Sequence, residues 1–135
     1  MARFLDTNIL IRYLTGDDPD KASLALALLD RVAEGTEQVV TTPLVIFETI
    51  FLLQRTYKLA KTDIREKITA ILAVQGLQLA ERALCLGALD YYVEQNISYA
   101  DAYNAAWMRG EGIAEVYSWD REFDRVAGLK RIEPV

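Results

Sequence analysis

Residues 3–8 read Arg-Phe-Leu-Asp-Thr-Asn, a short segment in which two apolar residues are followed by three polar residues. Its apolar part predicts a short buried strand, and Asp6 closes that strand. The residues that follow, 9–14, predict a brief helix. In parallel α/β sheets, ligands bind at the carboxyl ends of the strands, so a carboxylate in this position is a candidate ligand-binding group.

Short strands alternate with helices along the rest of the chain. We expect strands at 3–6, 38–41, 77–79, 115–118 and 130–133, and helices at 9–14, 20–34, 43–57, 63–75, 83–95 and 99–109. Such alternation implies crossover connections and a parallel sheet between layers of helices. We therefore predict a three-layer α/β/α sandwich with a short central parallel sheet, formed as a single domain by residues 1–135.

Local signals mark several helix ends. Pro43 follows Thr42 at a first helical position, and Thr62 is expected to cap the next helix. Ser98 and Asp101 have the spacing of a capping box. In the helix predicted at 20–34, the apolar residues that recur at helical spacing predict a buried face; they are Leu24, Ala25, Leu28, Leu29 and Val32.

The composition excludes several kinds of chemistry. The chain of 135 residues has no histidine, which removes histidine bases, triads and histidine metal sites. Its single cysteine, Cys85, allows no intrachain disulfide, and we expect a reducing cytoplasm. We see no membrane-length apolar run and no leader peptide. The net charge of −5 opposes nucleic-acid binding unless metal ions neutralise part of it.

Four carboxylates occupy positions at element edges or among apolar residues, where an unpaired charge is costly. They are Asp6, Glu48, Asp101 and Asp120. A divalent cation bound by all four carboxylates is the simplest way to neutralise their charge. Because all the ligand atoms would be oxygens, Mg²⁺ or Mn²⁺ is favoured. We expect Thr7, Asn8 and Ser118 to orient these groups or bound water.

Each acid also has a structural interpretation. Asp6 and Asp120 could be helix or turn caps, and Asp101 could belong to a capping box. Glu48 could face solvent, although its apolar neighbours predict a buried helix. Asp124 lies one turn beyond Asp120 and is a weaker candidate for the same pocket.

Taken together, these segments resemble the PIN domain family, and within it the VapC-type toxin ribonucleases. The matching segments are residues 4–8 (Phe-Leu-Asp-Thr-Asn), Glu48 after Thr42-Pro43, residues 99–102 (Tyr-Ala-Asp-Ala) and residues 117–123 (Tyr-Ser-Trp-Asp-Arg-Glu-Phe). Ser118 stands where the family usually has Thr, and Trp119 where Phe or Tyr is more common.

The resemblance implies a metal-dependent endoribonuclease, the toxin of a toxin–antitoxin pair. Asp6, Glu48 and Asp101 match the core acids, Asp120 the more variable fourth acid, and Asn8 an accessory polar residue. The implied cofactor is Mg²⁺ or Mn²⁺, and the implied partners are RNA, a cognate antitoxin and a second copy of the chain, with no membrane. The helices at 20–34 and 44–57 carry excess apolar surface, which we assign to a homodimer contact and an antitoxin groove.

Other functions remain open at this point. An aspartyl phosphatase usually carries a second Asp two residues after the first, where this chain has Asn8. A phosphoryl-accepting receiver domain needs a paired acidic motif and a late lysine, which we do not find. The third alternative is a PIN-like protein that has lost catalysis and only binds RNA or a protein partner.

Overall fold

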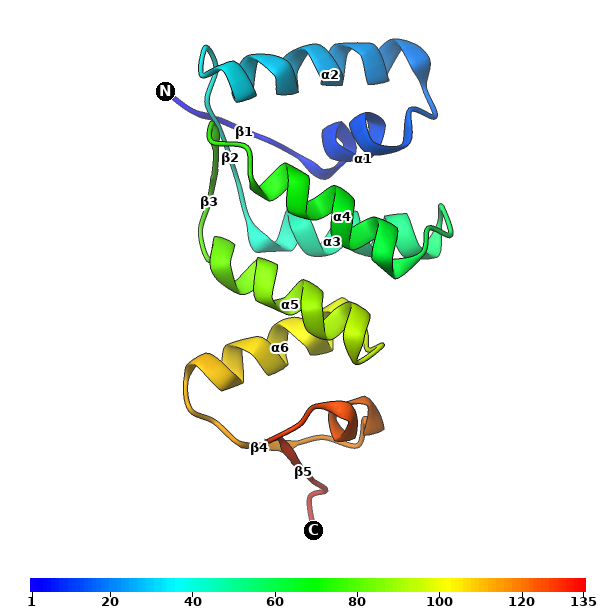
Figure 1. The fold of residues 1–135 in the computed structure, drawn as a ribbon, viewed down its shortest axis with the longest axis vertical. Helices are drawn as coiled ribbons and strands as arrows, with labels where there is room; N and C mark the ends of the chain where they lie inside the picture. Colours follow the sequence, from blue (N-terminus) through cyan, green and yellow to red (C-terminus); the bar gives the residue numbers. More distant parts are fainter. The chain divides into compact units, whose positions relative to one another are not determined.

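The computed structural model describes all residues from 1 to 135 and contains two compact units, Met1–Arg82 and Ala83–Val135 (Figure 1). Unit 1 contains β1 (Arg3–Phe4), α1 (Thr7–Thr15), α2 (Pro19–Glu34), β2 (Val39–Thr41), α3 (Pro43–Arg55), α4 (Lys61–Leu72) and β3 (Leu77–Leu79). Unit 2 contains α5 (Arg82–Glu94), α6 (Tyr99–Gly110), β4 (Glu115–Tyr117), the 3-10 helix η1 (Arg121–Arg125) and β5 (Lys130–Ile132).

Unit 1 is built on a parallel sheet with the strand order β1-β2-β3. The Thr41 hydroxyl donates to the Leu5 carbonyl at 2.9 Å, which extends the link between β1 and β2 to the end of both strands. Helix α1 packs on α2 and α3, and α3 packs on α4. The fully buried side chains of Leu10, Ile46 and Ile50 come from α1 and α3, so the helix that follows β1 is anchored in the core.

Three local predictions in unit 1 are wrong. Phe4 is exposed on β1, which pairs only with β2, and burial in this segment falls on Leu5. Leu24 is exposed on α2, whose buried face is narrower and consists of Ala25, Leu29 and Val32. Helix α4 begins two residues earlier than expected, so its N-cap is Ala60 and Thr62 lies inside the first turn.

Unit 2 pairs two helices with a small parallel sheet of β4 and β5. Its core includes Tyr92 and Tyr99, whose rings meet edge to face at a centroid distance of 5.9 Å. The Tyr99 hydroxyl donates to the Cys85 carbonyl at 2.9 Å, so the start of α6 is held against α5. Cys85 is buried and forms no disulfide, as expected of a small core residue.

The fold-class prediction of an α/β chain with a short parallel sheet is confirmed. Every predicted strand and helix is present, with ends within a few residues of the expected ones. Each helix proves too short or too polar to traverse a lipid bilayer. That residues 1–135 act as a single domain stays a prediction.

Candidate metal centre

The end of β4 presents two acids through a short chain of hydrogen bonds. The Ser118 hydroxyl accepts from the Asp120 N–H at 2.9 Å, and an Asp120 carboxylate oxygen accepts from the Glu122 N–H at 2.9 Å. Asp120 is thus the N-cap of η1. The structural interpretation of Asp120 as a cap is confirmed, and Ser118 orients the backbone that carries it.

The start of α6 supplies the third acid. Ser98 is the N-cap of this helix and accepts from the Asp101 N–H at 3.1 Å. The second half of the predicted capping box differs, because the Ser98 N–H donates to a Glu122 carboxylate oxygen at 3.1 Å. Glu122 therefore takes the capping contact expected of Asp101 and ties η1 to the start of α6.

Asp101, Asp120 and Glu122 form an acidic cluster, which we define by these three residues. One carboxylate oxygen from each lies within 4.8 Å of the others. Burial, followed by the neighbouring carboxyls of Asp120 and Glu122, raises the pKa of Asp101 to about 6. Three oxygen donors with excess negative charge form a donor set that suits a hard divalent cation such as Mg²⁺ or Mn²⁺.

Asp6 and Glu48 belong to unit 1. Asp6 occupies the N-cap position of α1, but its side chain makes no capping hydrogen bond, so the carboxylate is not engaged as an ordinary cap. Glu48 is exposed on α3, and the expectation that it sits on a helix buried all round is wrong. The other faces of α3 bury Val45, Ile46, Thr49, Ile50 and Leu53. That Asp6 and Glu48 share an ion with Asp101 stays a prediction.

The accessory residues differ in their surroundings. Thr7 is buried at the start of α1, whereas Asn8 is exposed and lines a pocket between α1 and α2. Asp124 is paired with Arg131 at 3.0 Å and does not belong to the acidic cluster. Their roles around a metal therefore remain predictions, and Asp124 is the weakest of the candidates.

Glu122 is the cluster residue that the sequence analysis did not single out. It is the second residue of η1, two positions after Asp120, in a run of charges that normally indicates a solvated face. The available signal was the Asp-Arg-Glu spacing after a strand end. Its place beside Asp101 depends on the contact with Ser98, which lies 24 residues away in the sequence.

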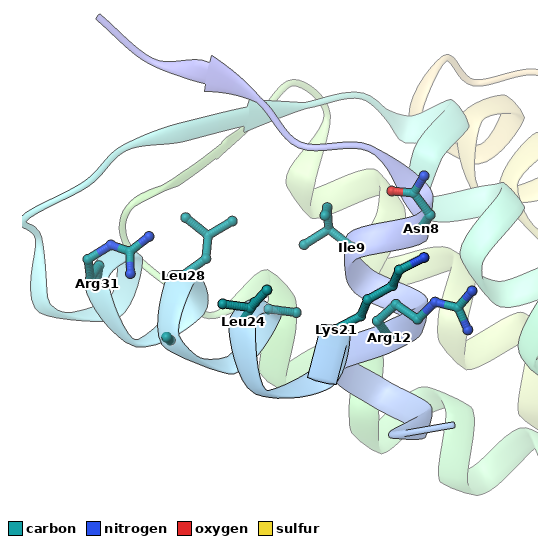
Figure 2. A pocket seen from close by; sticks show the side chains of 9 residues that line it. Asn8, Ile9, Arg12, Lys21, Leu24, Leu28 and Arg31 are labelled. Carbon is teal, nitrogen blue, oxygen red and sulfur yellow. The ribbon is translucent and has the colours of Figure 1, made fainter. Parts of the chain in front are cut away.

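A separate pocket of about 520 Å³ lies between α1 and α2 (Figure 2). Ile9 from α1 faces Leu24 and Leu28 from α2 across it (Figure 2). Arg12 and Lys21 lie at one end and Arg31 lies at the other end. Both arginines have acidic partners within unit 1, Asp17 at 2.8 Å and Glu37 at 3.1 Å. The pocket is thus an apolar cleft with partly neutralised basic ends.

Comparison with known proteins places the chain in a family. The PIN domain family matches residues 3–129, a span that covers most of both units. The chain belongs to the PIN domain family, and the resemblance drawn from its motifs is confirmed.

Two relatives extend this comparison. A VapC ribonuclease of Aquifex aeolicus is 24% identical over 132 residues, which covers 98% of this chain and 96% of that protein. A crystal structure of Mycobacterium tuberculosis VapC20, described as a sarcin–ricin loop cleaving toxin, is similar with a TM-score of 0.42 and 24% identity. That match covers 98% of this chain and 100% of the other.

Proposed function

We propose that this chain is a metal-dependent endoribonuclease and the toxin of a toxin–antitoxin pair. Membership of the PIN domain family and similarity to a VapC ribonuclease along nearly the whole length support this function. The observation that carries it is the meeting of Asp101, Asp120 and Glu122 at one point of the fold. We place the protein in the cytoplasm, where a single reduced cysteine is expected and RNA is present.

The cluster fits Mg²⁺ or Mn²⁺ as the cofactor, held by Asp101, Asp120 and Glu122 directly or through water. Such an ion activates water and stabilises negative charge on a phosphodiester. No side-chain nucleophile is then required, in keeping with the lack of histidine.

The protein's own groups prepare this site. Ser118 fixes the backbone of Asp120, and Glu122 connects η1 to Ser98, the N-cap of α6. Asp101 holds a proton below about pH 6 and must release it before it can act as a ligand. We further propose that Asp6 and Glu48 complete the ligand set and that Thr7 and Asn8 orient bound water.

Cleavage of defined RNAs tests the function. Wild-type protein with Mg²⁺ or Mn²⁺ should cut RNA, and chelation with EDTA should stop cleavage. Asp101→Asn should lower the rate by at least about 10-fold through loss of a ligand. Glu34→Gln is the matched control, because Glu34 is an exposed acid at the end of α2, outside the cluster, and it should retain activity. Cleavage that persists in EDTA would contradict metal dependence.

The antitoxin is a partner that we assign to the pocket between α1 and α2. Its walls are the apolar side chains of Ile9, Leu24 and Leu28. Leu24 has 72% of its surface exposed, and with Ile9 and Leu28 it forms one apolar patch that is open to solvent. An amphipathic helix of the antitoxin would cover these side chains.

A homodimer contact is assigned to the exposed face of α3, with Glu48, which lies on the same face, left uncovered at the edge of the contact. Leu44 and Phe51 are exposed by 72% and 47%, and Phe51 stacks on Phe47 at 6.2 Å. A dimer would remove this apolar face from water. Analytical ultracentrifugation at micromolar concentration should therefore show a dimer that Leu44→Asp weakens. Leu24→Asp is the matched control and should leave the dimer intact, whereas a monomeric wild type would contradict the assignment.

A further inference from the structure

Trp119 combines a fixed backbone with an exposed side chain. Its neighbour Ser118 donates its N–H to the Ile132 carbonyl at 3.1 Å, and the Ser118 carbonyl accepts from Arg131 at 3.1 Å. On the other side, the Asp120 N–H donates to the Ser118 hydroxyl at 2.9 Å. The chain therefore bends at Trp119 between residues that are held in place.

The indole itself is left in solvent. Trp119 has 72% of its surface exposed, and Tyr117, two residues earlier, has 75% exposed. These are the most exposed aromatic side chains of the protein, and both come from the segment that leads to Asp120. Large aromatic residues are mostly buried, so an exposed pair beside a candidate metal site indicates a binding surface.

We propose that Trp119 is a substrate-binding residue on which an unpaired base of the RNA stacks, next to the phosphate that is cleaved, with Tyr117 supporting a neighbouring base. This inference rests on the proposed ribonuclease function. Trp119 directly precedes Asp120, and the Cα atoms of neighbouring residues are about 3.8 Å apart, so the indole starts from the same point of the backbone as one member of the acidic cluster.

The chemistry of the ring favours a nucleobase. Aromatic side chains stack on any base, and each such contact contributes about 1–3 kcal/mol by alanine substitution. Unpaired bases are the usual target of such stacking, because bases inside a helix have no free face. A platform with a preset backbone loses little conformational entropy on binding. Arg121 is exposed and immediately follows Asp120, so it would place a positive charge next to the phosphate backbone of the bound RNA.

Tryptophan fluorescence can report on Trp119 alone, because the protein has only one other tryptophan, which can be replaced. Trp107→Phe leaves Trp119 as the sole indole and alters a residue on α6 outside the proposed site. In free protein its emission should be that of an indole in water and open to iodide quenching. Addition of a short single-stranded RNA should quench the emission and protect it from iodide, whereas the same RNA in a duplex should do so much less.

Kinetics separate stacking from a structural role. Trp119→Ala and Trp119→Leu should each raise KM for single-stranded RNA about 5- to 150-fold, the effect of one lost stack, with a much smaller change in kcat. Trp119→Phe keeps an aromatic face and should retain most of the affinity. If Trp119→Leu raises KM as much as Trp119→Ala does, the aromatic ring is needed and apolar bulk is not sufficient.

Three results would overturn the inference, and they differ in what else they affect. If wild type cleaves RNA while the Trp119 emission of Trp107→Phe is unchanged at saturation, or while Trp119→Ala keeps its KM, the stacking role is wrong and the ribonuclease stands. If wild type neither binds nor cleaves any RNA with Mn²⁺ present, both proposals fail.

Discussion

At the level of single residues, the acidic cluster lowers the stability of the metal-free protein when Asp101 is ionised. Burial and the carboxyls of Asp120 and Glu122 raise the pKa of Asp101 from 3.8 to about 6. Between these two pH values, the folded chain holds a proton that the unfolded chain has released. Stability contributed by protonated Asp101 is therefore fully present below about pH 4 and is lost as the pH rises through 6.

This shift gives a prediction for unfolding in EDTA. The free energy of unfolding of wild type should fall between pH 4 and pH 6 relative to Asp101→Asn, which cannot titrate at this position. At pH 7, Asp101→Asn should be the more stable of the two, and addition of Mn²⁺ should reverse the order. Urea denaturation at several pH values measures this free energy. If wild type and Asp101→Asn show the same dependence on pH, the pKa of Asp101 is not raised.

At the scale of the element, hydrogen bonds at helix ends test where each helix begins. Thr42 is the N-cap of α3 and accepts from the Val45 N–H at 3.4 Å, whereas Thr62 lies inside the first turn of α4. Thr42→Ala should lower the free energy of unfolding by about 0.5–2 kcal/mol. Thr62→Ala, the matched control, should change it by less than about 0.5 kcal/mol. Equal losses in thermal or urea unfolding would make Thr62, not Ala60, the N-cap of α4.

The same elements show what a sequence predicts well. Periodicity located the strands and helices, because a buried face imposes a repeat on the sequence itself. It did not locate the N-cap of α4, since Ala60 has the required extended backbone but no capping side chain. It also misjudged Glu48, because an apolar helix can expose part of its apolar surface, as Leu44 and Phe51 show.

Only two of the three acids of the cluster were predicted from the sequence. Asp101 and Asp120 stand at element ends, where local signals in the sequence are strong. Glu122 reaches the cluster through its contact with Ser98, far away in the sequence. Such a contact is set by tertiary packing: the local Asp-Arg-Glu spacing marks Glu122 as a candidate but does not identify Ser98 as its partner.

At the scale of the whole molecule, the remaining question is whether acids from both units bind one ion. The sequence motifs predict that Asp6 and Glu48 share it with Asp101, although the cluster in unit 2 already offers three oxygen donors. If the ion is shared, loss of any one ligand should weaken Mn²⁺ binding about 10- to 100-fold. Ligands of one ion should also be non-additive when two are removed together.

Calorimetric titration of Mn²⁺ measures this directly. Asp6→Asn, Glu48→Gln and Asp101→Asn should each weaken binding, and Glu48→Gln combined with Asp101→Asn should weaken it by less than the product of the single effects. Glu34→Gln, an exposed acid at the end of α2, is the control and should bind Mn²⁺ as wild type does. If only Asp101→Asn weakens binding, the ion belongs to Asp101, Asp120 and Glu122 alone, and Glu48 acts elsewhere on the exposed face of α3.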